Sequence, residues 1–154
     1  MKQKLKIGDI LYRSKGLVVK HAGAYFDDDL VIHNSPDGDV QISSTDQFSE
    51  GKSIQVVASK LSVKQAKQFQ LRAKEKLGQP KSYNVLSSNC EQLVSEILTG
   101  TASSPQVKGA VIGGVTAAIL AKSINSKHIL WLSLAGIVAG CVVVNAQRNY
   151  DYVI

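Results

Sequence analysis

The residues best suited to chemistry in this sequence are one cysteine and two histidines. Cys90 follows Asn89, a favoured helix N-cap, and Gln92 completes a capping-box pattern. A thiol in the first turn of a helix lies near unpaired backbone N–H groups and the positive end of the helix dipole, both of which favour the thiolate. His21 and His33 lie upstream, and an imidazole can act as the base for a thiol nucleophile. This set predicts nucleophilic catalysis through Cys90.

The segment that begins at Cys90 has the pattern of an amphipathic helix. Its apolar residues recur at the spacing of one helix face, at Leu93, Val94, Ile97 and Leu98. Gly100 supplies the stop signal. The same pattern allows a simpler role, in which Cys90 is a buried packing residue that starts the core face of its helix. The two histidines favour the catalytic interpretation.

The histidines lie in a segment, residues 7–58, that we interpret as an antiparallel sheet. Runs of β-forming residues between turn signals predict strands at residues 7–12, 17–26, 30–34, 40–42 and 54–58. Asp27-Asp28-Asp29 forms a polar turn between the second and third strands, and Ser35-Pro36-Asp37-Gly38 is a turn signal before the fourth. This arrangement places both histidines on neighbouring strands.

The length of the aspartate loop decides how the two histidines face each other. If the three aspartates form the loop, Phe26 faces Leu30 and Gly23 faces His33. His21 and His33 are then diagonal neighbours on one face of the sheet, within reach of long side chains. A five-residue loop would place them directly opposite each other, and a four-residue loop would place them on opposite faces.

A second helix is predicted between the sheet and the cysteine. Ser62 and Gln65 form a capping box, and Gly78-Gln79-Pro80 ends the helix. Its apolar positions form a core stripe, with lysines on the outside: Ala66, Phe69, Ala73 and Leu77.

The composition changes after Pro105. Residues 109–121 are uncharged and mostly small or apolar, and residues 129–146 form a run of eighteen with few polar side chains. Each run carries glycines at GxxxG spacing, which lets membrane helices approach closely: Gly109 and Gly113, then Gly136 and Gly140. Because both runs are apolar around their whole circumference, we expect residues 109–146 to associate with a membrane. The alternative is a buried helical hairpin in a soluble core.

These features suggest a domain of residues 1–107 followed by an apolar tail of residues 108–154. The predicted sheet and two helices form a complete amphipathic set, so we expect the domain to fold without the tail. No secretory signal is visible, so we expect the domain to be kept in a reducing compartment. Together with the apolar tail, this predicts a membrane-associated protein whose domain faces the cytoplasm. The net charge of +6 is spread along the chain without interleaved aromatic residues, which argues against nucleic acid. The two cysteines fit neither a zinc site nor a disulfide framework.

Four short stretches together resemble the lecithin retinol acyltransferase-like family, which includes the H-Ras-like suppressor phospholipase/acyltransferases. They are Gly8-Asp9-Ile10, His21-Ala22-Gly23-Ala24-Tyr25, Val31-Ile32-His33 and Asn89-Cys90-Glu91. The resemblance covers residues 5–107 and implies an α+β domain with a permuted NlpC/P60 (papain-like) fold, in which an antiparallel sheet packs on the cysteine-bearing helix. It also implies Cys90 as nucleophile, His21 as general base and His33 as the residue that orients the base. The implied substrate is a phospholipid or another lipid ester, with no cofactor and no metal.

The sequence departs from the family pattern at three positions, which leaves alternatives open. Many relatives have a histidine and an aromatic residue where this chain has Gln92 and Leu93, and phospholipid-active members usually have tryptophan where it has Ala22. One alternative is a cysteine amidase or peptidase of the NlpC/P60 type. Another is a membrane-anchored binding module without catalytic activity.

Overall fold

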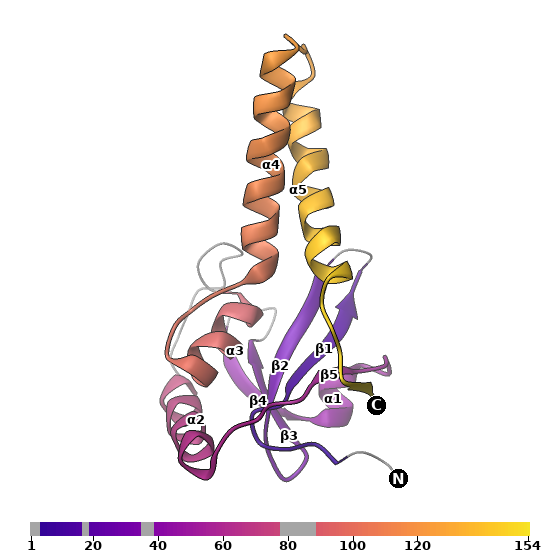
Figure 1. Cartoon of the computed structure of the whole chain (residues 1–154). Coiled ribbons are helices and arrows are strands. Elements are labelled where there is room, and N and C mark those ends of the chain that lie inside the picture. The colour runs from indigo at the N-terminus through magenta and orange to yellow at the C-terminus, as the bar shows by residue number, and fades with distance from the viewer. Residues whose placement is uncertain (1–3, 17–18, 35–38, 78–88) are drawn as a thin grey trace. The chain divides into compact units, whose positions relative to one another are not determined.

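The computed structural model describes residues 4–16, 19–34, 39–77 and 89–154 (Figure 1). The chain divides into two compact units. One unit consists of residues 1–15, 20–103 and 149–154 and contains a β-sheet with three helices. The other consists of residues 16–19 and 104–148 and contains two helices. The predicted turn at residues 35–38 and the predicted helix stop at residues 78–80 lie outside the described residues.

The sheet confirms the α+β class predicted from the sequence. Its six strands lie in the order β4-β3-β2-β1-β5-β6. Every described strand pair is antiparallel. The strands are β1 (Ile10–Lys15), β2 (Val19–Asp27), β3 (Leu30–Asn34), β4 (Val40–Ser44), β5 (Gln55–Val57) and β6 (Tyr152–Val153). The first five overlap the predicted strands, although β1 begins later than expected.

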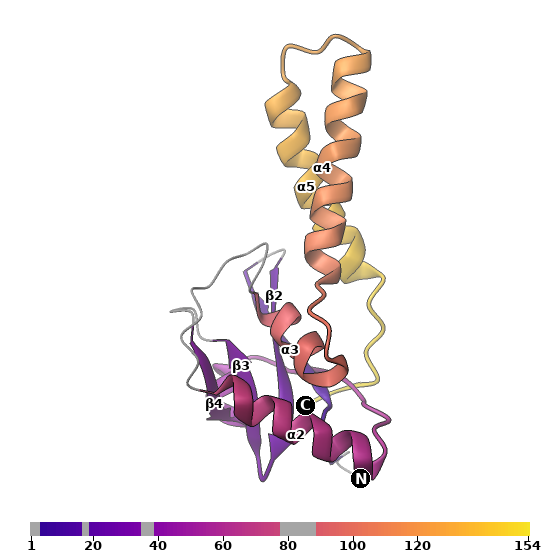
Figure 2. The ribbon, with the colours of Figure 1, turned by 90° about the vertical axis from the view of Figure 1, so that its left-hand side faces the viewer.

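Helices cover both faces of this sheet. Helices α2 (Val63–Lys76) and α3 (Cys90–Thr99) lie on the same side of it (Figure 2). They contribute Phe69, Ala73, Leu93, Val94 and Ile97 to a core that also contains Ala22, Ala24 and Ile32 of the sheet. A second core holds Phe48 of helix α1 (Thr45–Ser49) together with Leu11, Val31, Ile54 and Val56. Side chains of one strand alternate between these two cores, as the pleat requires.

Each of these three helices begins with a capping box. Ser62 with Gln65 opens α2 and Asn89 with Gln92 opens α3, as predicted, and Gly100 ends α3 in the left-handed conformation at φ 84°. Helix α1 was not among the predicted elements. Its capping box, Ser44 with Gln47, was the available signal, because this pattern marks a helix start even before a short helix.

The pairing of β2 with β3 makes the two histidines diagonal neighbours on one face, which is one of the three placements that the sequence left open. Gly23 pairs with His33, as a three-residue loop requires. The residue pair expected next to the turn was wrong: an irregularity in β2 pairs Leu30 with Asp27 instead of Phe26. That irregularity leaves a two-residue loop, Asp28 and Asp29, with φ angles of 41° and 64°. Both central residues of a type I′ hairpin turn have positive φ, a conformation that aspartate tolerates.

The last residues of the chain belong to the sheet, which differs from the tail of residues 108–154 predicted from the sequence. Strand β6 pairs with β5, placing Val153 opposite Gln55 and Tyr152 opposite Val56. Tyr150 and Tyr152 also pack against the two cores. Folding of the domain without residues 108–154 stays a prediction, and a chain truncated there would lose β6 from the edge of the sheet. A two-residue strand has no periodicity that a sequence pattern could reveal.

The buried carboxylate of Asp9 joins three distant segments of this unit. Its oxygens accept hydrogen bonds from the backbone N–H of Lys6 at 2.9 Å and of Ser59 at 2.7 Å. The hydroxyl of Tyr152 donates to the same carboxylate at 3.2 Å. Burial raises the pKa of Tyr152 to about 12, with a smaller contribution from the neighbouring Asp9 charge, so the hydroxyl remains a donor. The Asp9 carboxylate thus connects the start of the chain to the segment after β5 and to strand β6.

The second unit is a hairpin of helices α4 (Pro105–Ser123) and α5 (Ile129–Ala146). Their GxxxG glycines face each other crosswise: a Cβ on Gly113 would lie 2.1 Å from the Gly136 carbonyl oxygen, and one on Gly140 would lie 2.0 Å from that of Gly109. No residue of α5 is buried. By length and composition, α5 is the one described helix that could cross a membrane. Helix α5 could therefore be a membrane anchor.

We predict that Tyr152→Phe lowers the free energy of unfolding by about 1–3 kcal/mol, because a buried carboxylate loses a hydrogen-bond donor. Tyr25→Phe is a matched control, since its hydroxyl accepts a hydrogen bond from the exposed N–H of Asp29. The control should cost less than about 1 kcal/mol. Circular dichroism melting of both variants in detergent would check the difference. Equal losses would show that Asp9 does not depend on the β6 hydroxyl.

Candidate active site

The structure brings the two predicted histidines into direct contact. His21 on β2 and His33 on β3 are diagonal neighbours, and the distance from His21 Nε2 to His33 Nδ1 is 3.1 Å. Both residues are buried, at 4% and 5% exposed. The ring of Phe48 stacks on the ring of His21, with centroids 5.3 Å apart and an interplanar angle of 28°. The ring of Phe48 also meets the edge of His33. The histidine pair is therefore held between the sheet and α1.

Polar groups of β3 and β4 lie near both ring nitrogens of His33. The Nε2 atom of His33 makes a hydrogen bond with the hydroxyl of Ser43. The side-chain nitrogen of Gln41 lies 3.5 Å from the same Nε2. The Nδ1 atom lies 3.3 Å from the backbone carbonyl oxygen of Asn34. His33 thus has a polar partner at each ring nitrogen.

Cys90 occupies the predicted position at the start of α3, and its thiol contacts the backbone of β2. Its Sγ accepts a hydrogen bond from the N–H of Ala22 at 3.4 Å and lies 3.9 Å from the carbonyl oxygen of Lys20. These two residues flank His21 in the sequence. Within the described part of the chain, neither imidazole ring is a hydrogen-bonding partner of the thiol.

The pleat of β2 explains why the thiol and the imidazoles are not joined. Ala22 belongs to the core that contains Cys90 and α3. His21 contacts Phe48, and a Cβ on Gly23 would lie 2.8 Å from the same ring, so both residues face α1. Successive residues of a strand point to opposite faces. The histidine pair therefore lies on one face of the sheet. The thiol lies on the opposite face, beside the residues of β2 that flank His21.

Burial makes the histidine pair neutral at physiological pH. It lowers the pKa of His21 from 6.5 to about 3, with further contributions from His33 and from the positive charges of Arg13 and Lys15. Burial also lowers the pKa of His33, while the Asn34 carbonyl acts in the opposite direction. Two neutral imidazoles can each offer one N–H and one lone pair.

The same physical effect corrects the expectation that the start of the helix makes Cys90 a thiolate. Burial raises the pKa of the Cys90 thiol, and the neighbouring Glu91 charge acts in the same direction. The N–H groups of Glu91 and Cys90 at the start of the helix lower that pKa, as does the N–H of Ala22 on β2, but burial is the largest single effect and the pKa rises overall. The resting pair is therefore a thiol and a neutral imidazole.

A hollow of about 390 Å³ opens beside the histidine rings on the face that carries α1. Arg13 and Glu50 form an ion pair at this hollow, and the Arg13 guanidinium lies over Phe48 at 5.7 Å from the ring centroid. Small molecules can therefore approach the imidazoles from this side. Among the described residues, no group of three or more histidine, cysteine, aspartate or glutamate side chains is arranged to hold a metal ion.

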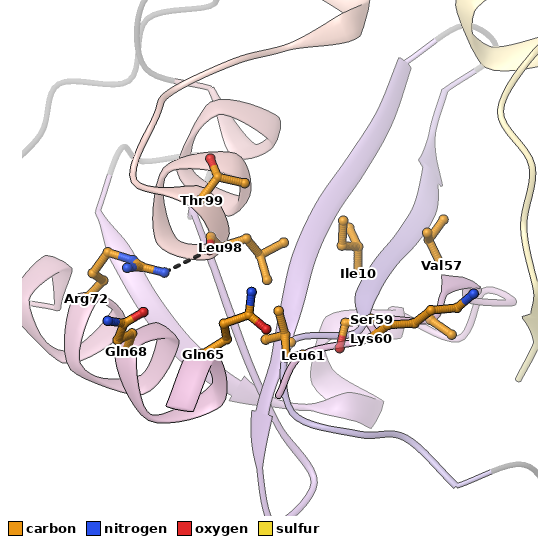
Figure 3. A pocket seen from close by; sticks show the side chains of 12 residues that line it. Ile10, Val57, Ser59, Lys60, Leu61, Gln65, Gln68, Arg72, Leu98 and Thr99 are labelled. Atoms are coloured by element: carbon orange, nitrogen blue, oxygen red, sulfur yellow. Dashed lines mark hydrogen bonds between the residues drawn. The ribbon is translucent and has the colours of Figure 1, made fainter. Parts of the chain in front are cut away.

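A second hollow, of about 490 Å³, lies beside α2 and the end of α3 (Figure 3). Its lining includes Leu61, Gln65 and Leu98, but neither histidine nor Cys90. The guanidinium of Arg72 at its edge donates to the carbonyl oxygens of Ile97 at 2.6 Å and Leu98 at 2.7 Å. Arg72 therefore holds the end of the cysteine helix against α2, which is a structural role.

Sequence reasoning missed four residues around the histidine pair. Phe48 was detectable through the capping box of α1, and Ser43 through a fourth strand two residues longer than predicted. Arg13 and Glu50 form an ion pair although they are 37 positions apart in the sequence, and no local pattern predicts such a pair.

We predict that Cys90 in detergent-solubilised Cys141→Ser protein is alkylated by iodoacetamide more slowly than glutathione at pH 7. Its rate should still be rising at pH 9, because burial holds the thiol pKa above its usual value of 9.0. Mass spectrometry of quenched samples would give the rate at each pH. The same protein unfolded in denaturant should react like glutathione. A rate that levels off below pH 7 would mean that the resting cysteine is a thiolate.

Comparison with known proteins identifies the family of this chain. A family model described as lecithin retinol acyltransferase matches residues 3–103, which is more than half of the chain and includes His21, His33 and Cys90. No curated protein matches the chain. The protein therefore belongs to the lecithin retinol acyltransferase family, whose members are in general acyltransferases.

Proposed function

We propose that this protein is a membrane-tethered thiol enzyme that removes an acyl group from a lipid ester and carries it as a thioester on Cys90. The family supports acyltransferase or phospholipase-like chemistry. The observation that supports these particular residues is the position of the thiol, whose Sγ contacts the backbone of Lys20 and Ala22 on either side of His21. The permuted NlpC/P60 topology is part of this proposal.

The proposed reaction has two balanced steps. In the first, Sγ of Cys90 attacks the ester carbonyl carbon, its proton passes to His21, and the alcohol part of the lipid leaves with that proton. In the second, water, an amine or an alcohol attacks the thioester carbonyl and gives its proton to His21. The C–S bond then breaks and the proton restores the thiol. Backbone N–H groups at the start of α3 are suited to stabilise the oxyanion in both steps.

The ring nitrogens of His21 fit this role in a specific way. Nε2 is engaged by His33, so Nδ1 is the nitrogen that can take the thiol proton. His33 then orients the base, as the third member of a catalytic triad does. For the proton to pass, Sγ must leave the Ala22 N–H and meet the His21 ring. The contacts that it leaves, at 3.4 and 3.9 Å, are those of a weak sulfur acceptor and a weak S–H donor.

The hairpin supplies the proposed tether. Helix α5 is long and apolar enough to span a membrane, and its partner α4 packs on it through the paired glycines. A tether holds the site next to lipid and raises the effective substrate concentration. We propose that the domain faces the cytoplasm, which suits the two free cysteines.

A second candidate is a membrane-anchored binding module of the same family without catalytic activity. The opposite placement of the thiol and the imidazoles favours it, as does the protonated resting thiol. A third, the NlpC/P60-type amidase or peptidase, would act on peptides and not on lipid esters. Release of fatty acid from phosphatidylcholine vesicles by the full chain supports the acyl-transfer proposal. Peptide cleavage without fatty-acid release favours the third candidate, and neither activity favours the second.

Alanine substitutions of the three proposed catalytic residues should have unequal effects. Cys90→Ala should abolish fatty-acid release, because no thioester can form. His21→Ala should reduce the rate by about 10²–10⁴-fold, the usual contribution of a general base. His33→Ala should be milder, because it removes orientation and not the base. Full turnover by Cys90→Ala would refute the thioester mechanism, and a larger loss for His33→Ala than for His21→Ala would reverse the two roles.

The membrane tether makes a separate prediction. In cells, the full chain should stay with the membrane fraction after alkaline extraction, and the double variant Ile137→Lys, Val138→Lys should be released. Each lysine at the centre of a span costs about 2.5–3.5 kcal/mol of insertion free energy. Val63→Lys with Leu71→Lys is a matched control, because both residues are exposed on α2. Immunoblots of pellet and supernatant would measure the distribution. Retention of the α5 double variant would contradict the tether.

A further inference from the structure

We propose that Ser43 is a positioning residue that sets the proton arrangement of the histidine pair through His33. This inference rests on the proposed function, since it concerns the base of that reaction. Ser43 lies at the end of a continuous row of side chains that crosses three strands. The hydroxyl of Ser43 bonds to His33 Nε2, and His33 Nδ1 lies 3.1 Å from His21 Nε2.

The register of the sheet creates this row. Gly23 pairs with His33, so His21 is the diagonal neighbour of His33 on β2. Gln41 pairs with His33 on the other side, so Ser43 is the diagonal neighbour of His33 on β4. Side chains two positions apart on a strand share a face, and diagonal neighbours lie within reach of long side chains. The same geometric step, made twice, brings hydroxyl, imidazole and imidazole into line.

The row permits two proton arrangements, because each neutral imidazole carries one N–H. In the first, His21 Nε2–H donates to His33 Nδ1 and His33 Nε2–H donates to the oxygen of Ser43. This arrangement leaves the lone pair of His21 Nδ1 free to accept a proton. In the second, Ser43 O–H donates to His33 Nε2 and His33 Nδ1–H donates to His21 Nε2. His21 then carries its proton on Nδ1 and has no free lone pair.

The neighbours of His33 other than Ser43 and His21 favour the second, inactive arrangement. The Asn34 carbonyl oxygen, 3.3 Å from Nδ1, can only accept and therefore favours Nδ1–H. The side-chain nitrogen of Gln41, 3.5 Å from Nε2, can only donate and favours an unprotonated Nε2. The Ser43 oxygen is the acceptor that makes the first arrangement possible. Because the Asn34 carbonyl and the Gln41 nitrogen both act against the first arrangement, that arrangement depends on the Ser43 oxygen. We therefore assign to Ser43 the role of making available the tautomer in which His21 can act as a base.

The decisive measurement is the nitrogen NMR signal of the imidazoles in the full-length protein in detergent micelles at pH 7. Long-range ¹H–¹⁵N correlation distinguishes a protonated from an unprotonated ring nitrogen. In the unsubstituted protein we expect the proton on Nε2 of both His21 and His33. In Ser43→Ala, we expect it on Nδ1 of both rings, and Ser43→Thr should restore the original pattern. A proton on Nδ1 of His21 in the unsubstituted protein would overturn the proposal even if Ser43→Ala failed to fold. An unchanged pattern in a folded Ser43→Ala would overturn it as well.

Rates of fatty-acid release add a second readout. Ser43→Ala should reduce kcat/KM by about tenfold, the effect of losing one hydrogen bond worth about 1.4 kcal/mol, and Ser43→Thr should recover most of it. Ser95→Ala is the control, because its hydroxyl donates to the Thr101 carbonyl beyond the far end of α3. If the predicted tautomers appear without any fatty-acid release, the positioning role stands and the proposed lipid chemistry fails. If release occurs with the inactive tautomer pattern, the positioning role fails alone.

Discussion

The pairing of β2 with β3 is the constraint on which the candidate site depends. The turn at Asp28 and Asp29, with the irregularity before it, sets Gly23 opposite His33. That register brings the His21 and His33 rings together, and β4 extends the row to Ser43. A slip by one residue would turn one histidine to the other face and separate the rings. The chemistry of the site is therefore set first by backbone hydrogen bonds, and only then by the side chains.

Burial is the second determinant, and it outweighs the local effects that the sequence suggests. The start of α3 offers N–H groups that favour a thiolate, yet burial raises the pKa of Cys90. The same desolvation keeps His21 neutral. In the proposed reaction a neutral thiol gives its proton to a neutral imidazole only during attack, once Sγ has moved to the His21 ring and the ester carbonyl is in place. Such a pair avoids leaving two unpaired charges in the core, which would be costly in a buried site.

The parts of the molecule that the sequence predicts are those fixed by local interactions. The capping boxes at Ser62 and Asn89 depend on residues three positions apart. The β2–β3 register was only partly predictable, because a two-residue turn and an irregularity between Tyr25 and Asp27 together give the pairing that a three-residue loop would give. Strand β6 was not predictable in this way, because Tyr152 reaches Asp9 across 143 positions. The placement of Cys90 on the face opposite His21 likewise follows from how α3 packs on the sheet, which no spacing within α3 encodes.

Mass spectrometry can test directly whether Cys90 carries the acyl group. The full chain would be mixed with phosphatidylcholine vesicles, quenched in acid within seconds and digested for peptide mapping. We expect the peptide containing Cys90 to gain the mass of one fatty acyl group, which neutral hydroxylamine removes, and the peptide containing Cys141 to remain unmodified. Fatty-acid release with an unmodified Cys90 peptide at every quench time, or an acyl group on another residue, would contradict the thioester mechanism.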